Sequence, residues 1–255
     1  MASQSEFSLE ERRDWAGRFG VAPGAIDHDH LISHLLLALS TWEQDVLFYG
    51  GTALLRTHLS GIRLSEDIDL QIDSPGHHAD PLGGHLLRAI RRDYPDAAWE
   101  RQSAPRGQTI GYLKADDLAV RVHAVCPDEN LPAETVPIEL RYSDLPKSAP
   151  LRIPTRSALT AMKTGAYMDR AAPRDLVDLD GLAEIGALDE EAARVLKGVF
   201  GIEVVRQEFD RVRPSTMQAW EAELGLLMRE IPSPEACLRR VRNAYSQVLG
   251  WEPAV

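Results

Sequence analysis

The chain has 255 residues, and 39 aspartates and glutamates outnumber 28 lysines and arginines, which gives a formal net charge of −11. This balance counts against a general nucleic-acid binder with a broad basic surface, although an enzyme that touches only the end of an RNA needs just a local basic patch. No apolar run approaches the roughly 20 residues that span a bilayer, so we expect no membrane partner.

The cysteines and the start of the chain bear on the cellular compartment. Cys126 and Cys237 lie far apart in the sequence and have no metal-ligand spacing, so we expect both to be reduced and buried. The first residues, Met-Ala-Ser-Gln-Ser-Glu-Phe, lack the basic and apolar regions of a signal peptide. Together these features predict a cytoplasmic protein.

A helix with its body at residues 31–39 is expected early in the chain, with Asp27 or Asp29 as its cap. His30 and His34 share one face of this helix, which raises the question of a metal site. No cysteine or further histidine completes a ligand set, so we interpret them as surface and core histidines.

A short buried strand at residues 46–48 leads into Gly50, Gly51 and Thr52. Adjacent glycines let the backbone turn tightly and let its N–H groups approach an anion without a Cβ in the way. An apolar helical segment at residues 53–55 follows, and the positive N-terminal end of such a helix suits a phosphate. The pattern predicts a phosphate-binding turn.

Asp67 and Asp69 lie in the next strand-like segment. Residues i and i+2 of a strand point to the same face, so the two carboxylates are expected side by side, with Ser65 one position earlier on that face. Oxygen ligands at this spacing suit Mg²⁺, which usually takes one or two carboxylates plus the phosphates of a substrate.

The region that follows has the pattern of a loop at residues 74–84 and a basic helix at 85–92. Strand-like segments then alternate with loops at a spacing that favours a mixed or antiparallel sheet over repeated βαβ units. These segments are residues 97–102, 109–114, 118–125 and 136–142.

Residues 145–154 have the pattern of a junction, and the chain beyond it is helical. Thr155 is expected to cap a helix at residues 157–168. We therefore predict an α/β (α+β) fold with two domains: a mixed-sheet domain at residues 1–150 and a helical domain at residues 151–255.

Two groups of residues resemble the AbiEii/AbiGii toxin family, which includes the MenT toxins and belongs to the DNA polymerase β-type nucleotidyltransferases. The first is Gly50-Gly51-Thr52 followed, about a dozen residues later, by Arg63-x-Ser65-x-Asp67-x-Asp69. The second is Lys163 on a helix, followed by Arg174-Asp175-x-x-Asp178-Leu at the start of the next helix.

The resemblance implies a polymerase-β-type domain and assigns roles to these residues. Asp67 and Asp69 would hold Mg²⁺ or Mn²⁺, and Lys163 would hold the triphosphate of a bound NTP. Asp178 would be a further functional carboxylate, while Asp175 acts as a helix cap or as the partner of an arginine. The remaining residues expected to bind the nucleotide are Gly50, Gly51, Thr52, Arg63, Ser65 and Arg174. The active site is expected in the cleft between the two domains.

The second motif also lies in a basic stretch of this acidic chain. Five basic side chains form a local positive strip where phosphates are expected: Arg152, Arg156, Lys163, Arg170 and Arg174.

One position departs from the superfamily pattern. Such enzymes usually place a third carboxylate on a later strand, but the segment at residues 118–125 has His123 at the matching position and no acidic residue at the alternating ones. An imidazole suits the role of general base, so His123 either replaces the carboxylate or is an inert strand residue.

The family resemblance implies transfer of a nucleoside monophosphate from an NTP to the 3′ end of tRNA, which blocks translation. The protein would be the toxin of a type IV-like toxin–antitoxin system with a separately encoded antitoxin. Two alternatives stay open: a nucleotidyltransferase acting on a small molecule such as an antibiotic, and a catalytically silent nucleotide-binding module.

Overall fold

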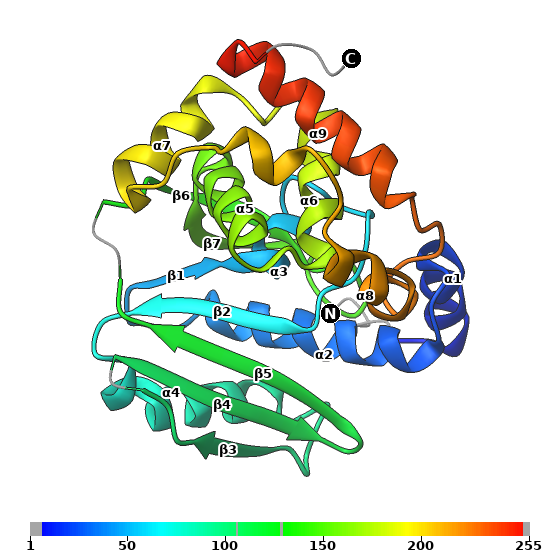
Figure 1. The fold of residues 1–255 in the computed structure, drawn as a ribbon. Helices are drawn as coiled ribbons and strands as arrows, with labels where there is room; N and C mark the ends of the chain where they lie inside the picture. The colour runs from blue at the N-terminus through cyan, green and yellow to red at the C-terminus, as the bar shows by residue number, and fades with distance from the viewer. Residues whose placement is uncertain (1–6, 106, 128–129, 252–255) are drawn as a thin grey trace. The chain divides into compact units, whose positions relative to one another are not determined.

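The computed structural model describes residues 7–105, 107–127 and 130–251 (Figure 1). Contacts divide the chain into two compact units. Unit 1 comprises Met1–Glu129 with Ala133–Ile153, and unit 2 comprises Asn130–Pro132 with Pro154–Val255.

Unit 1 is built on a mixed five-stranded sheet with the strand order β1-β2-β5-β4-β3. Its strands are β1 (Val46–Tyr49), β2 (Asp67–Ile72), β3 (Ala98–Gln102), β4 (Gln108–Ala115) and β5 (Leu118–Val125). Strands β2 and β5 run parallel, and the other neighbours run antiparallel. A separate two-stranded sheet pairs β6 (Ala133–Glu139) with β7 (Ser148–Pro154). The predicted α/β class with a mixed sheet is confirmed.

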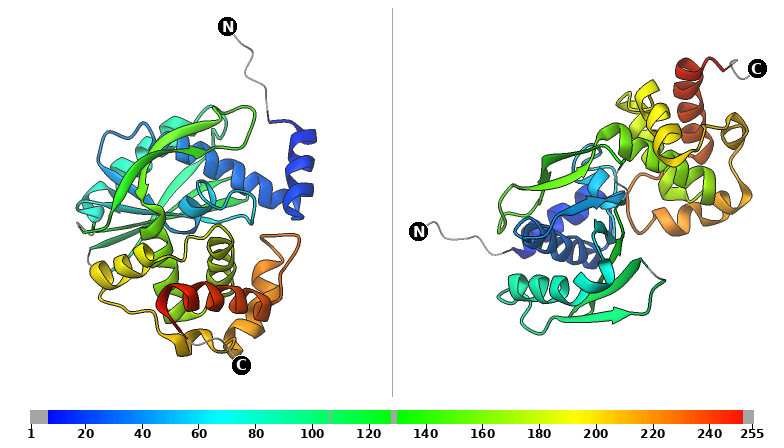
Figure 2. Two further views of the ribbon diagram at one scale, coloured as in Figure 1. Left: turned by 90° about the horizontal axis from the view of Figure 1, so that it is seen from above. Right: turned by 90° about the vertical axis from the view of Figure 1, so that its left-hand side faces the viewer.

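Helices α2 (Pro23–Leu39) and α4 (Pro75–Ile90) pack against each other and against one face of the large sheet (Figure 2). The strands alternate accordingly, since Ile68 and Leu70 of β2 are fully buried between more exposed neighbours. The same alternation occurs in β5, where Val120 and Val122 are buried. One face of β2 and β5 therefore forms the core with the helices, and the other is left for polar side chains.

Two further helices complete unit 1. Helix α1 (Leu9–Phe19) is capped by Ser8, whose hydroxyl accepts a hydrogen bond from the amide of Glu11 at 3.1 Å. Helix α3 (Gly50–Leu55) follows β1 directly and contacts both β1 and β2.

Unit 2 is helical in the part of the chain that is described. It contains α5 (Arg156–Arg170), α6 (Pro173–Glu184), α7 (Glu190–Phe200), the 3₁₀ helix η1 (Arg206–Phe209), α8 (Pro214–Leu224) and α9 (Pro234–Leu249). Helix α6 packs against α5, α8 and α9. As predicted, Thr155 caps α5, accepting a hydrogen bond from the amide of Ala158. The core includes the rings of Tyr167, Phe209 and Tyr245.

The prediction that Asp27 or Asp29 caps helix α2 is wrong, because both residues lie inside the helix. The helix begins at Pro23, a position that proline tolerates because the first helical N–H has no intrahelical partner. Asp29 lies inside the helix, 2% exposed, where it binds two buried arginines rather than backbone amides.

The expected loop at residues 74–84 is wrong, because this segment forms most of α4. Pro75 again opens the helix, and the glycines inside it have a packing role. A Cβ at Gly83 would overlap the ring of Trp99, so the missing side chain makes room for the indole. Tertiary packing thus outweighs the low helix propensity of this glycine.

Three smaller expectations also change. The junction at residues 145–154 is largely strand β7. Strand β6 ends at Glu139 rather than at residue 142, and Arg141 beyond its end has a positive φ of 69°. Cys237 is buried as expected, but Cys126 is exposed. Among the described residues, no helix has the length and apolar character that crossing a bilayer requires.

Candidate active site

Strand β2 presents Asp67 and Asp69 on the face of the sheet that α2 and α4 leave uncovered. Their side chains are 35% and 25% exposed, respectively, while Ile68 between them is fully buried. Both carboxylates therefore point to the same side of the strand and remain accessible, as the sequence spacing predicts.

The glycine turn lies directly against the second of these carboxylates. Gly50 has a φ of +81°, and a Cβ built on it would overlap the Oδ2 atom of Asp69. A side chain at position 50 would therefore meet both backbone strain and a steric overlap. Gly51 is the second residue of α3.

A hydrogen bond ties α3 to β2. Thr52 is 2% exposed, and its hydroxyl donates a hydrogen bond to the backbone carbonyl of Asp67. The structure thus brings together Gly50, Gly51, Thr52, Asp67 and Asp69, which the sequence spreads over 20 positions.

Basic side chains on β5 stand beside the carboxylates. The register pairs Asp67 with Arg121 and Asp69 with His123. An Arg121 Nη1 atom lies 3.8 Å from Asp67 Oδ2, and His123 Nδ1 lies 3.6 Å from Asp69 Oδ1. His123 thus lies beside the aspartate pair, where the third carboxylate was expected. Arg121 was not predicted, although it occupies the alternating position two residues earlier.

Tyr49 completes the immediate surroundings of the pair. It lies opposite Asp69 in the register of β1 and β2. Burial raises the pKa of the Tyr49 hydroxyl, and the negative charge of Asp69 raises it further. The hydroxyl is therefore a neutral hydrogen-bond donor at physiological pH.

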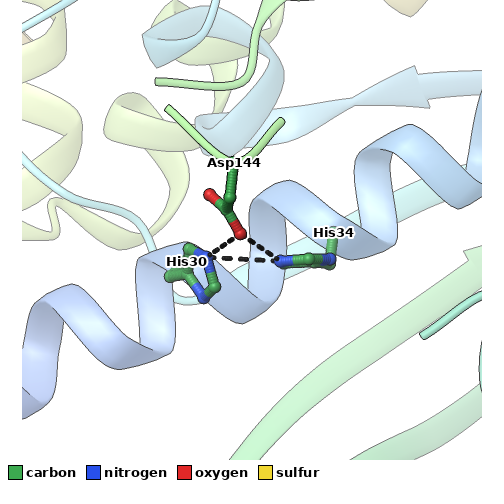
Figure 3. Close-up of side chains that lie close together, drawn as sticks. All are labelled: His30, His34 and Asp144. Atoms are coloured by element: carbon green, nitrogen blue, oxygen red, sulfur yellow. Dashed lines mark hydrogen bonds and ion pairs between the residues drawn. The ribbon is translucent and has the colours of Figure 1, made fainter. Parts of the chain in front are cut away.

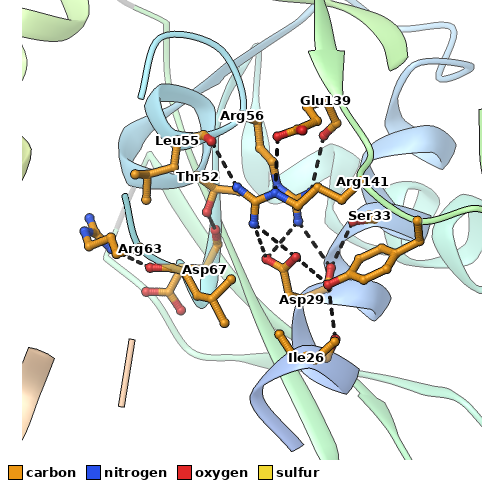
Figure 4. A network of polar contacts seen from close by, with 12 residues as sticks. Ile26, Asp29, Ser33, Thr52, Leu55, Arg56, Arg63, Asp67, Glu139 and Arg141 are labelled. Carbon is orange, nitrogen blue, oxygen red and sulfur yellow. Dashed lines mark hydrogen bonds and ion pairs between the residues drawn. The ribbon is translucent and has the colours of Figure 1, made fainter. Parts of the chain in front are cut away.

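A buried polar network supports the C-terminal end of α3 (Figure 4). Asp29 of α2 binds Arg56 at 2.9 Å and Arg141 at 3.1 Å, and it accepts a hydrogen bond from Tyr142 at 2.7 Å. Arg141 also donates to the carbonyl of Leu55, the last residue of α3. The network therefore fastens α3 to α2 and to the segment after β6.

Burial raises the pKa of Asp29, but the charges of Arg141 and Arg56 outweigh that effect and leave it lowered. Burial and the neighbouring Arg141 lower the pKa of Arg56 to about 10, so its guanidinium stays charged at neutral pH. The network is an ionised cluster in which two cations surround the Asp29 carboxylate and one of them, Arg141, also pairs with Glu139 at 3.3 Å. Its residues share no recognisable local motif.

Two other predicted residues of the first motif lie just before β2. Arg63 is 1% exposed and donates a hydrogen bond to the carbonyl of Leu64 at 2.7 Å (Figure 4). Ser65 precedes the strand, which begins at Asp67, so the expectation that it shares the strand face is wrong. Ser65 is half-buried.

In unit 2, Lys163 lies between two carboxylates. Its Nζ atom is 2.9 Å from Asp175 and 2.8 Å from Asp178, and both aspartate side chains are fully buried. Arg170 also binds Asp175, with a distance of 2.7 Å from Nε, as expected of a carboxylate that partners an arginine. Burial raises the pKa of Asp175, but Lys163 and Arg170 outweigh it and leave the pKa lowered.

The predicted positive strip is neutralised by acidic partners. Arg174 binds Glu223 at 3.1 Å, and Lys163 and Arg170 bind the aspartates of α6. Arg152 binds Asp45 at 3.3 Å and Arg156 lies 3.9 Å from Asp189. The strip is therefore a set of ion pairs rather than an excess of free positive charge.

Comparisons with solved structures identify the fold. MenT4, a nucleotidyltransferase toxin from Mycobacterium tuberculosis, has 22% sequence identity and a TM-score of 0.61, with 91% of this chain and 86% of that chain covered. A putative nucleotidyltransferase from H. pylori has 19% identity and a TM-score of 0.59, with 89% and 95% covered. At these identities the likeness establishes the fold, which is that of a nucleotidyltransferase.

The family follows from a second comparison. The model of the family described as "Nucleotidyl transferase AbiEii toxin, Type IV TA system" matches residues 31–245. The chain belongs to this family, and the resemblance inferred from its motifs is confirmed. The search of curated proteins gave no match.

Proposed function

We propose that this member of the AbiEii family is a metal-dependent nucleotidyltransferase that transfers a nucleoside monophosphate from an NTP to the 3′ end of tRNA. The observation that carries the proposal is the close packing of the Gly50 turn against the Asp69 carboxylate. This packing supports the proposal, because a glycine turn of the kind that can approach phosphate lies beside carboxylates of the kind that can bind a divalent cation.

The residues of β2 fit a divalent metal ion. Asp67 and Asp69 offer oxygen ligands on one accessible face, and Gly50 leaves space that a Cβ would fill beside Asp69. Such ligands suit Mg²⁺ or Mn²⁺. When bound, the ion would neutralise charge on the phosphates during in-line transfer.

The reaction forms a bond between the α-phosphorus of the NTP and the acceptor oxygen, and it breaks the bond to the β-phosphate, which leaves as pyrophosphate. The hydroxyl proton of the acceptor needs a base. His123 is our candidate, because its Nδ1 atom lies 3.6 Å from Asp69 and no third carboxylate follows on β5. Gly50, Gly51, Thr52 and Ser65 are the proposed residues that position the triphosphate.

Lys163 and Asp178 of unit 2 are proposed to take part in the same reaction, with Arg63 and Arg174 as further nucleotide-binding residues. Lys163 is bound by two buried carboxylates, so its ammonium would have to exchange part of this pairing to reach a phosphate. A second role fits the contacts equally well, in which Lys163 holds Asp178 in place. Activity and stability must therefore be measured together at this position.

The proposed biological role follows from the family. Modification of the acceptor end of tRNA would block translation, and a separately encoded antitoxin would counter it. The cytoplasm is the proposed location because NTPs and tRNA meet there. A net charge of −11 is compatible with an enzyme that touches the end of an RNA rather than its length.

The test is incubation of the purified protein with each labelled NTP, total tRNA and Mg²⁺, with and without chelator. We expect labelled tRNA with the wild-type protein and none with Asp67→Asn or Asp69→Asn. Parallel reactions offer an antibiotic in place of tRNA, and label that appears only on the antibiotic would favour the alternative substrate class. NTP binding without release of pyrophosphate would identify a silent binding module, the alternative that Arg121 and His123 beside the aspartates favour.

A further inference from the structure

Unit 1 contains a second group of potential metal ligands, apart from the aspartates of β2. His30 and His34 lie one turn apart on α2, and Asp144 reaches them from the segment after β6 (Figure 3). The sequence predicts no metal site here, because no cysteine or further histidine completes the ligand set. The third ligand is an aspartate 110 positions beyond His34, which no local pattern connects to the histidines.

The spacing of the three ligand atoms matches a tetrahedral site. His30 Nε2 and Asp144 Oδ2 are 3.0 Å apart, His34 Nε2 and Asp144 Oδ2 are 3.3 Å apart, and the two Nε2 atoms are 3.2 Å apart. A tetrahedral Zn²⁺ site with bonds of about 2.0–2.1 Å has ligand-to-ligand separations of roughly 3.3–3.4 Å. The three atoms therefore already form a face of such a tetrahedron to within a few tenths of an ångström.

The opposite ring nitrogen of His30 has a hydrogen-bond partner, and that of His34 lies near a carboxylate at longer range. Nδ1 of His30 lies 2.8 Å from the hydroxyl of Tyr94, and Nδ1 of His34 lies 3.8 Å from a carboxylate oxygen of Asp93. A hydrogen bond such as that of His30 orients the imidazole so that Nε2 faces the ion. Both rings are nearly buried, with His30 7% and His34 8% exposed.

Polar groups at the site favour a cation. The Oδ1 atom of Asp144 is buried without a hydrogen-bond partner. The three ligands line one cavity of about 870 Å³ that also bears four further carboxylates and one arginine. These are Asp27, Asp93, Asp116, Asp117 and Arg92. Asp27 is paired with Arg12, but the other three carboxylates still outnumber Arg92. This surplus of negative charge attracts cations and disfavours an anionic ligand.

We infer that His30, His34 and Asp144 form a binding site for one Zn²⁺-type transition-metal ion, with a fourth ligand, such as water, supplied from the acidic cavity. Two imidazoles and one carboxylate are a ligand set of Zn²⁺, whereas Mg²⁺ prefers oxygen ligands alone. This inference does not rest on the proposed transferase function, because it concerns other residues and another metal chemistry.

The position of the site suggests what the ion does. Asp29 precedes His30, and Tyr142, which donates to Asp29 at 2.7 Å, lies two residues before Asp144. A metal bridge between α2 and the segment after β6 would therefore fasten the same two elements that the Asp29–Arg56–Arg141 network joins beneath α3. The ion would stabilise unit 1 and hold the support of the glycine turn in place.

The experiment uses the full chain, stripped of metal with a chelator and then titrated with Zn²⁺ or Co²⁺. The background is Asp67→Asn/Asp69→Asn, so that the β2 pair does not contribute. We expect one tightly bound ion per chain, the strong visible absorption of tetrahedral Co²⁺, and a Tm that rises on adding Zn²⁺. Absence of the tetrahedral Co²⁺ spectrum in this protein overturns the site without the need for any further variant.

Variants then locate the ion. His34→Gln and Asp144→Asn should abolish the Co²⁺ spectrum and the Zn²⁺-dependent rise in Tm, with circular dichroism as the check of folding. Tyr94→Phe removes a positioning contact and should weaken Zn²⁺ binding by about 10–100-fold. His77→Gln, on the exposed side of α4, is the matched control and should bind like the parent. Unchanged binding in folded His34→Gln and Asp144→Asn would show that the ion binds elsewhere and would refute the assignment.

Discussion

The Oδ2 atom of Asp69 lies where a Cβ on Gly50 would have to go, so a side chain at position 50 would overlap the carboxylate. The missing side chain of Gly50 thereby permits the turn expected to bind phosphate to lie directly against the strand expected to bind metal. This relationship makes position 50 the most direct place to test the proposed site.

Gly50→Ala should inactivate the protein while leaving it folded. The new Cβ would overlap Asp69 Oδ2, and alanine at a φ of +81° costs about 1–2 kcal/mol of stability. Displacing a catalytic group by about 1 Å can reduce a rate by about 10²-fold, so we expect a loss of at least that size in tRNA labelling. Rates are measured with labelled NTP, and stability by chemical denaturation.

Gly198→Ala is the matched control for this change. Gly198 lies inside α7, and a Cβ there would meet nothing within 4 Å. Alanine in such a helix position should raise the free energy of unfolding by about 0.5–1 kcal/mol without changing the labelling rate. If Gly50→Ala keeps the wild-type labelling rate, the glycine turn does not take part in the reaction.

Variants of His123 test whether this histidine acts as the general base in place of the third carboxylate. If its imidazole accepts the proton of the acceptor hydroxyl, His123→Ala should lower the labelling rate by about 10²–10⁴-fold with little change in NTP affinity. His123→Asp places a carboxylate beside Asp69 and should retain activity. The rate and the affinity are measured separately, by single-turnover labelling and by equilibrium NTP binding.

The exposed His77 provides a control substitution, His77→Gln, that should leave the labelling rate unchanged. A His123→Ala protein with the wild-type rate would identify this histidine as an inert strand residue.

The two cysteines should differ sharply in reactivity. Cys126 is exposed, whereas burial raises the pKa of the Cys237 thiol to about 12 and Asp180 adds to that shift. The thiolate is the reactive form, so at pH 8 a thiol reagent should label one cysteine in the native protein and both in denaturant. Cys126→Ser should abolish the native reaction, and persistent labelling of that variant would contradict the burial of Cys237.

The parts of the fold that the sequence reveals are those set by local pattern. The alternation in β2 places Asp67 and Asp69 on one face, and the hydroxyl of Thr155 caps α5. Long-range packing decides the rest. The glycines of α4 make residues 74–84 resemble a loop in the sequence. Their role becomes clear only in the structure, where the ring of Trp99 packs against Gly83.

The candidate site shows the same division. The Gly-Gly-Thr and Asp-x-Asp motifs are visible in the chain, and the structure brings them into contact. The ion pair between Asp29 and Arg141 joins residues 112 positions apart, so no local sequence pattern predicts it. Asp144 joins His30 in the same way, since its position is set by how the segment after β6 folds back on α2.

Lys163 should matter for stability as well as for activity. Lys163→Met leaves Asp175 and Asp178 buried with one cation fewer, and breaking a buried ion pair in this way typically costs about 3–5 kcal/mol. Adding Asp178→Asn should recover part of that loss, because it removes one of the two buried negative charges that Lys163 no longer balances. Denaturation of the two single variants and the double variant measures the coupling, which should exceed about 0.5 kcal/mol.

The labelling rates of the same three proteins decide the role of Lys163. A double variant that regains stability but not activity would support a chemical role for Lys163 or Asp178. Recovery of both would indicate that the pair serves the fold of unit 2 alone.

Low pH should reduce the free energy of unfolding of the wild-type protein, because Asp175 becomes protonated. Lys163 and Arg170 outweigh burial and leave the folded pKa of Asp175 below its ordinary value of 3.8, so the unfolded chain binds the proton more readily. The stabilisation is therefore complete above the unfolded pKa, near pH 4, and is lost as the pH falls through the lower, folded pKa. Asp175→Asn should be less stable at pH 7 and should show a smaller loss of stability between pH 5 and pH 2 than the wild type. Denaturation midpoints measured across this range provide the comparison, and parallel pH profiles for the two proteins would show that Asp175 is not ionised in the fold.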